Sequence, residues 1–361
     1  MTTTVHILTE GFKTPNGRAF LFPLLCNLRA LDERGIQLKF FLSPEKNICE
    51  CDVLLVENKY FGKRWAADSD GVVAELAKYS ATGIKLFYFD ITDSSGWDHA
   101  RALSVVTVYL KNQLLIDRSA YLAPHYGHRI FCDHYHRHNG VEDKNGASSE
   151  PVADPQLLKK LHVGWNSGLA DWSRWGPTRM GMFSRIGWPK ALLASRRNFT
   201  QPSAKRPLEL SCRFGVSYER DTVAFQRQSI ARIMADRLAT DKLGRSDYFK
   251  EMQQARTVIS PFGLGEITLK DFEVFMTGAL LFKPDMSHME TWPNFFVAGE
   301  TMVTHKWNLE DFLEQLDDIN TNYQKYLEIA VAGQERYRDF IEGSAGETNF
   351  CDHFARLLRL G

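Results

Sequence analysis

The stretch from Arg256 to Phe282 constrains the fold of this chain more than any other. Two short apolar runs, 256–259 and 279–282, flank a glycine-bearing loop and an amphipathic segment, which predicts a strand, a loop, a helix and a second strand. In open α/β sheets, ligands bind beyond the carboxyl ends of the strands, where glycines let the backbone approach a phosphate and a helix N-terminus attracts it. The loop 260–265 is therefore a predicted ligand site.

A polar stripe runs along the expected helix. If the helix begins near Glu266, one face carries Glu266, Lys270, Glu273 and Thr277. This stripe offers a cation for a phosphate, and carboxylates that can accept hydrogen bonds from ribose hydroxyls. The spacing is equally typical of a solvated face, because Glu266 and Lys270 form a favourable i,i+4 pair. Spacing alone leaves both interpretations open.

A short signature in this helix favours the ligand site. Glu273, followed five residues later by Gly278, resembles the Glu-Ala-x-x-x-Gly end of the E-x7-E motif in GT-B glycosyltransferases, which have two Rossmann-like domains. The resemblance implies that Glu273 binds the ribose of a nucleotide sugar. Lys270 is similar to the basic residue that exostosin-like and related members carry for the diphosphate.

The motif departs from the family pattern at its first position. The first Glu would stand at Gly265, and the nearest carboxylate is Glu266, which is kept as a candidate catalytic residue. Arg213 ends the first strand expected in the second domain, where related glycosyltransferases carry an arginine for the diphosphate; a structural salt bridge is the alternative. The implied donor-binding residues are Arg213, Phe262, Gly263, Gly265, Lys270 and Glu273.

Alternating strands and helices extend over the whole chain. At 361 residues the chain exceeds the size at which one core usually suffices, and the alternation predicts parallel sheets with crossover helices. We expect an α/β protein with a Rossmann-like acceptor-side domain over 1–197, a linker over 198–207 and a Rossmann-like donor domain over 208–345. The resemblance implies that the two domains face each other across a cleft and that a helix within 346–361 returns to the first domain.

Charge and hydropathy exclude some classes of protein. Lys plus Arg and Asp plus Glu both number 44, so bulk attraction to nucleic acid or to anionic membranes is not indicated. No apolar run approaches the length that spans a bilayer, and the N-terminus lacks the layout of a signal peptide. The six cysteines form no disulfide framework. We therefore expect a reduced, cytoplasmic protein without a nucleic-acid partner, for which peripheral membrane association stays open.

Several carboxylates end strands of the first domain and compete for one role. An inverting transferase needs a base near the acceptor hydroxyl. Asp90 and Asp93 follow one strand, while Glu10 and Glu57 end others. Asp93 equally suits the cap of a short helix. The sequence does not select one of them, and the candidate catalytic residues are Asp90, Asp93, Glu10 and Glu266.

Histidines alternate between Cys132 and His138. In a strand, period two would place them on one face, where two imidazoles two residues apart can share a zinc ion. The segment equally suits a loop lining an acceptor pocket, and we expect no metal site. The first glycine-bearing loop also lines the acceptor side by resemblance, and an indole can stack on a sugar ring. The expected acceptor-binding residues are Lys13, Asn16, His134, His136 and Trp292.

These features together predict a glycosyltransferase. It would move a sugar from a nucleotide-diphosphate sugar to a glycan or polysaccharide acceptor in the interdomain cleft, without a metal ion or another cofactor. Catalysis would come from positioning and from stabilisation of the departing nucleoside diphosphate. A nucleotide-sugar epimerase of the same fold and a catalytically silent glycan-binding protein are the alternatives.

Overall fold

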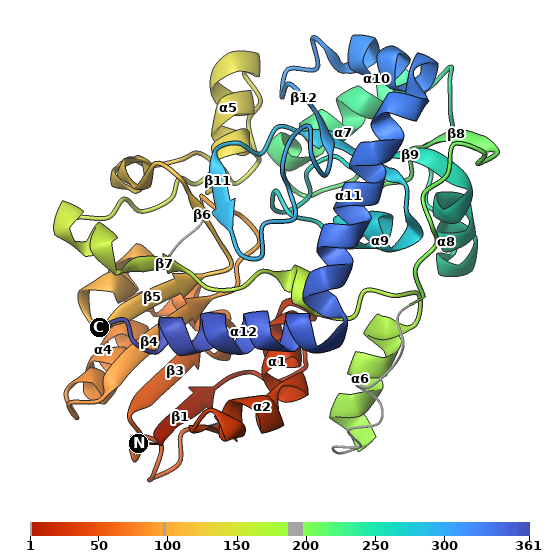
Figure 1. The fold of residues 1–361 in the computed structure, drawn as a ribbon. Coiled ribbons are helices and arrows are strands. Elements are labelled where there is room, and N and C mark those ends of the chain that lie inside the picture. Colours follow the sequence, from red (N-terminus) through yellow and green to blue (C-terminus); the bar gives the residue numbers. More distant parts are fainter. Residues whose placement is uncertain (1, 97–98, 187–197) are drawn as a thin grey trace.

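Six parallel strands form the sheet of the first domain. The computed structural model describes residues 2–96, 99–186 and 198–361, and this sheet lies in the lower half of the molecule (Figure 1). The strands pair in the order β2-β1-β3-β4-β5-β7. Their bounds are Thr3–Leu8 (β1), Ile36–Phe41 (β2), Val53–Glu57 (β3), Lys85–Asp90 (β4), Val108–Lys111 (β5) and Leu161–Val163 (β7).

Both faces of this sheet are buried. In β1, Val5 and Ile7 pack into one core and Leu8 packs into the core on the other face, because successive side chains of a strand point to opposite faces. Parallel strands connected by crossover helices are covered on both sides in this way. The helices within the first 197 residues are α1 (Pro15–Cys26), α2 (Leu28–Glu33), α3 (Arg64–Ala67), α4 (Ser69–Ser80), α5 (Ile130–Asn139) and α6 (Gly176–Ile186). Helix α5 does not cover this sheet and lies in the upper part of the molecule (Figure 1).

Four parallel strands form the sheet of the second domain, in the order β12-β10-β9-β8. They are β8 (Leu208–Ser211), β9 (Ala255–Ile259), β10 (Leu280–Pro284) and β12 (Val303–His305). The accompanying helices are α7 (Asp221–Met234), α8 (Arg245–Gln254), α9 (Leu269–Thr277), α10 (Phe312–Thr321) and α11 (Tyr323–Ile341). The predicted α/β class with two Rossmann-like domains is confirmed.

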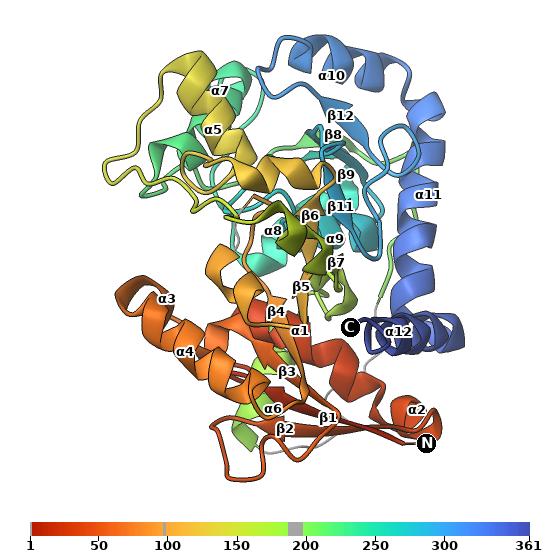
Figure 2. The same ribbon diagram turned by 90° about the vertical axis from the view of Figure 1, so that its left-hand side faces the viewer.

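Two connections join the domains: a pair of strands and a pair of helices. Strand β6 (Gln113–Leu115) pairs antiparallel with β11 (Met289–Thr291), although the two are far apart in sequence. Helix α11 runs from the second sheet, and α12 (Gly343–Leu357) then crosses the first domain (Figures 1 and 2). Phe350 and Phe354 of α12 pack with Trp165 in a core of the first sheet. The expected return of the C-terminal helix is confirmed, with a start at Gly343.

Two predictions of local structure are wrong. The histidine segment forms helix α5 instead of a strand or loop, and Gly140 ends it in the left-handed conformation (φ 64°). Helix α9 begins at Leu269 instead of Glu266, because Thr268 caps it and forms a capping box with Asp271. Glu266 therefore lies in the loop before α9 and does not share a stripe with Lys270.

The segment between the domains is described only in part. The expected boundary at 197 lies outside the described residues, and the linker over 198–207 stays a prediction. Arg206 donates hydrogen bonds to the carbonyl oxygens of Ala255 (2.8 Å) and Thr277 (2.6 Å), so this part of the segment packs on the second domain. No helix in the described ranges combines the length and apolar character that crossing a bilayer requires.

Candidate active site

A cavity of about 470 Å³ lies between the two domains. Its first wall holds Asn16 at the start of α1, Lys59 after β3 and Asp93 after β4. The opposite wall holds Arg227 of α7 and the loop from Gly263 to the first residue of α9, Leu269. The cavity therefore lies beyond the carboxyl ends of β4 and β9, where ligands of open α/β sheets bind.

Asp93 is the one predicted catalytic carboxylate that lines this cavity among the described residues. The side-chain amide of Asn16 donates to Oδ1 of Asp93 (2.9 Å) and to the carbonyl oxygen of Ile91 (3.0 Å). Gln113 donates to the Asp93 carbonyl oxygen. These contacts hold the half-buried carboxylate at the edge of the cavity, so Asn16 orients Asp93 as well as lining the wall.

Gly265 brings the two walls into contact. A Cβ atom at this position would lie 1.6 Å from the carbonyl oxygen of Asp93, so only glycine fits there. A Cβ atom at Gly263 would lie 3.3 Å from Nη2 of Arg227. The backbone of this loop thus lies directly beside the main chain of Asp93 and the guanidinium of Arg227.

Arg227 is the cation of the second domain that lines the cavity. Its Nε donates to the carbonyl oxygen of Phe262 (2.5 Å) and its Nη1 to that of Gly215 (3.1 Å). The guanidinium also lies over the rings of Phe214 and Tyr218, at 5.6 and 5.2 Å. Burial lowers its pKa, yet arginine keeps its charge in proteins. The sequence gives no signal for this role, because an arginine on a helix face is usually solvated.

The basic residues implied by the resemblance do not line the cavity. Lys270 donates to the carbonyl oxygen of Arg213 and lies 5.4 Å from the ring centre of Phe214, and burial lowers its pKa to about 8. Arg213 forms a salt bridge with Glu251 (3.0 Å). Both cations therefore already have partners within the second domain.

Glu273 lies on α9 and faces α8. It is 6% exposed and pairs with Arg245, whose Nη1 lies 3.2 Å from its Oε1. Burial raises the pKa of Glu273, against the opposing effect of Arg245. The side chain of Phe262 is also buried, against Phe131 at a centroid distance of 5.0 Å, and only its carbonyl oxygen is turned to Arg227.

Glu266 connects the domains from the loop before α9. It is fully buried and accepts hydrogen bonds from the Ser95 backbone N–H (3.0 Å) and the Ser95 hydroxyl (2.6 Å), while His288 lies 3.5 Å away. Burial by itself raises the pKa of Glu266, but His288 and Ser95 together outweigh it and lower the pKa to about 2. Glu266 thus positions the loop and does not line the cavity.

The remaining carboxylates and Lys13 lie elsewhere. Asp90 is fully buried, 3.2 Å from Nζ of Lys111, and accepts a hydrogen bond from the Tyr109 hydroxyl (2.7 Å). Burial by itself raises the pKa of Asp90, but the nearby charges of Lys111 and His99 outweigh burial and hold the pKa below its ordinary value. Asp90 and Lys111 therefore form a structural ion pair. Glu10 accepts from the Thr14 hydroxyl within its own loop. Lys13 is exposed.

Two other predicted acceptor contacts are also placed away from this cavity. His136 stacks on Tyr126 (3.9 Å), and Trp292 stacks on His353 of α12 (3.7 Å). His134 lines a second cavity instead. Within the described residues, no group of three His, Cys, Asp or Glu side chains is arranged to hold a metal ion.

Comparison with solved structures identifies the architecture. No protein-family model and no curated protein matches the sequence. The lipopolysaccharide outer core galactosyltransferase WaaB, in its apo form, superposes with a TM-score of 0.51 at 9% identity, covering 99% of this chain and 100% of WaaB. This chain has the GT-B fold. The predicted resemblance is thereby confirmed at the level of the fold.

Other solved structures match over similar lengths. HepE from Anabaena, in complex with UDP-glucose, has a TM-score of 0.47 at 9% identity and covers 99% of both chains. A glycosyltransferase from Rickettsia africae has a TM-score of 0.44 at 8% identity, covering 100% of this chain and 99% of its own.

Proposed function

We propose that this GT-B chain is a glycosyltransferase that uses a nucleotide-diphosphate sugar and a glycan or polysaccharide acceptor. One observation carries the proposal: Asp93 of the first domain faces Arg227, Gly263 and the start of α9 across one cavity. A base and an anion-binding wall on opposite sides of a cavity are what transfer to a hydroxyl group needs.

The donor diphosphate would lie against the second domain. The guanidinium of Arg227 can meet a phosphate beside Gly263, where no side chain blocks the backbone. The N-terminus of α9 adds the positive end of the helix dipole. Lys59 supplies a second cation from the first domain, and its Nζ forms no ion pair within the described part of the chain.

The acceptor would approach from the first domain. Asp93, oriented by Asn16, would accept the proton of the attacking hydroxyl as this hydroxyl bonds to the sugar carbon and the nucleoside diphosphate leaves. The leaving diphosphate gains negative charge in this step, and Arg227 and α9 stabilise that charge. Glu273 stays our proposed ribose ligand. Lys270 and Arg213 stay proposed donor-side residues, and Lys270 contacts the main chain at Arg213. We propose that no metal ion is required.

A screen of nucleoside diphosphates and nucleotide sugars tests this function. We expect one nucleoside diphosphate to raise the unfolding temperature, because a ligand that binds only the folded state stabilises it. The matching nucleotide sugar should then release that diphosphate in the presence of a glycan acceptor. Conversion to an isomeric sugar without release would instead identify an epimerase. Binding without turnover would indicate a silent glycan-binding protein.

A further inference from the structure

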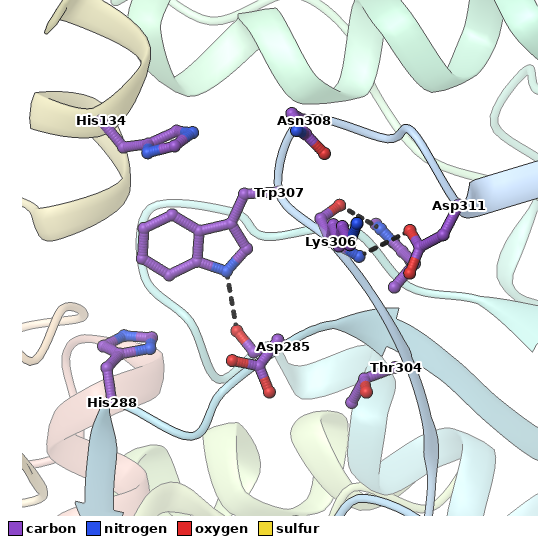
Figure 3. A pocket seen from close by; sticks show the side chains of 9 residues that line it. His134, Asp285, His288, Thr304, Lys306, Trp307, Asn308 and Asp311 are labelled. Atoms are coloured by element: carbon purple, nitrogen blue, oxygen red, sulfur yellow. Dashed lines mark hydrogen bonds between the residues drawn. The ribbon is translucent and has the colours of Figure 1, made fainter. Parts of the chain in front are cut away.

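A second cavity, of about 590 Å³, lies in the second domain beyond the carboxyl ends of β10 and β12 (Figure 3). His134 of α5 contributes to one side, and the segment 304–308 contributes to the other. The loop before α9 separates this cavity from the first. Gly265 lines the first cavity, whereas its neighbour Glu266 contacts His288, which lines the second.

An indole is fixed in the wall of this cavity. Trp307 donates from Nε1 to the carbonyl oxygen of Asp285 (2.8 Å). The imidazoles of His134 and His288 stand perpendicular to it, at centroid distances of 5.3 and 5.0 Å, and Phe262 packs at 5.9 Å. Figure 3 shows the indole between the two imidazoles. A partly buried aromatic ring held by four neighbours is a preorganised stacking surface.

Polar side chains surround the indole. Asp285, Asn308 and Asp311 line the cavity and offer carboxylate and amide oxygens. Three buried imidazole nitrogens have no hydrogen-bond partner among the described residues: Nε2 of His134, Nδ1 of His288 and Nε2 of His305. These nitrogens are buried, so the imidazoles shape the wall of the cavity instead of offering hydrogen bonds to it.

The charges in this cavity disfavour an anion. Two carboxylates line it, and the one lysine or arginine among the lining residues, Lys306, points to Glu310 at 3.5 Å. A phosphate or nucleotide would meet two negative charges with no free cation to offset them. A neutral ring with several hydroxyl groups suits both the indole face and the surrounding acceptors.

We propose that this second cavity binds a neutral saccharide unit of the acceptor glycan. The saccharide ring would stack on Trp307, and its hydroxyl groups would hydrogen-bond to Asp285 and Asn308. Its role as an acceptor subsite rests on the proposed function, whereas binding of a saccharide does not. The first cavity holds the donor and the reacting hydroxyl, and the second holds a unit farther along the acceptor.

Saturation-transfer NMR with the intact chain tests this site. The probes are the methyl glycosides of glucose, galactose, mannose and N-acetylglucosamine, without nucleotide. We expect at least one to bind, and Trp307→Ala to weaken that binding tenfold or more. Trp175→Ala is the matched control, because Trp175 is an exposed indole (58%) outside both cavities, and it should leave binding unchanged. Adding the nucleoside diphosphate found by the donor screen should not displace the glycoside.

A second variant guards against misfolding of the first. Asn308 is exposed, so Asn308→Ala should fold and weaken glycoside binding several-fold. The proposal is overturned if no glycoside binds the wild type, if both variants bind as tightly as the wild type, or if the nucleoside diphosphate displaces the glycoside. Failure of donor turnover with intact glycoside binding would count against the proposed function and leave this site standing.

Discussion

At the scale of single residues, the structure selects among side chains that the sequence leaves equal. Asp90 and Asp93 follow the same strand, three residues apart, yet Lys111 of the neighbouring strand neutralises Asp90, and Asn16 turns Asp93 to the cavity. These partners lie 21 and 77 residues away in the sequence, so local sequence could not separate the two carboxylates. The role of Arg227 also depends on distant residues, because Phe262, whose carbonyl oxygen it meets, lies 35 residues farther along the chain.

The diphosphate contact that we assign to Arg227 makes a selective prediction. Arg227→Ala should weaken nucleoside diphosphate binding by about 1.5–3 kcal/mol, the range for hydrogen bonds to charged groups. The bare nucleoside should lose far less affinity, because it carries no phosphate. Calorimetry with both ligands measures the difference. Arg232→Ala is the control, since Arg232 is an exposed arginine on the same helix. Equal losses for both ligands would contradict the assignment.

Glu266 predicts a dependence of stability on pH. Its pKa is lowered from 4.5 to about 2, so its contribution is present above pH 4.5 and is lost as the pH falls towards 2. Glu266→Gln should therefore lower the free energy of unfolding at pH 7 by on the order of 3 kcal/mol, and the difference from the wild type should shrink in acid. Denaturant unfolding at several pH values measures this. Glu328→Gln, at an exposed site on α11, is the control; a constant difference across pH would contradict the prediction.

At the scale of elements, most strands and helices follow from the sequence, and the exceptions have local causes. Strands β9 and β10 lie within two residues of the expected runs 256–259 and 279–282, because those runs are apolar. The alternating histidines of α5 suggest a strand, because their period is two. The segment is a helix instead, and its Phe131 and Tyr135 pack into a core. Helix α9 starts at Leu269 instead of the expected Glu266, because Thr268 and Asp271 form a capping box there.

The helical form of α5 bears on metal binding. His134 turns to Trp307 and His136 turns to Tyr126, so the two imidazoles do not converge on one point. We expect the purified protein to carry no stoichiometric zinc and to keep its activity in a chelator. Elemental analysis checks the first point. About one zinc per chain, lost in a His134→Ala/His136→Ala double variant, would contradict it.

At the scale of the whole molecule, the GT-B arrangement depends on contacts that only the folded chain reveals. The sequence predicted two α/β domains and a returning helix, and the fold confirms both. It did not predict the β6–β11 pair or the contact of Glu266 with Ser95, because both link segments more than 170 residues apart. These contacts fix how the two domains are oriented, and this orientation determines the shape of the cavity between them.

The crossing of α12 should contribute to the stability of the first domain. Phe354 is 1% exposed and packs on Trp165 at a centroid distance of 5.9 Å. Phe354→Ala should lower the free energy of unfolding by about 3–5 kcal/mol, as for other buried aromatic residues. Glu347→Ala, at an exposed site on the same helix, should cost under about 1 kcal/mol. A loss of that small size in Phe354→Ala would show that α12 is not part of this core.

The turnover of Asp93→Asn tests the central claim most directly. With the donor found in the screen, we expect kcat to fall about 10²- to 10⁴-fold, the usual contribution of a general base. The affinity for the nucleoside diphosphate should stay unchanged, because Arg227 and α9 hold it from the other wall. Asp236→Asn, at an exposed site, controls for loss of a surface charge. A kcat within threefold of the wild type would contradict the assignment of this cavity as the active site.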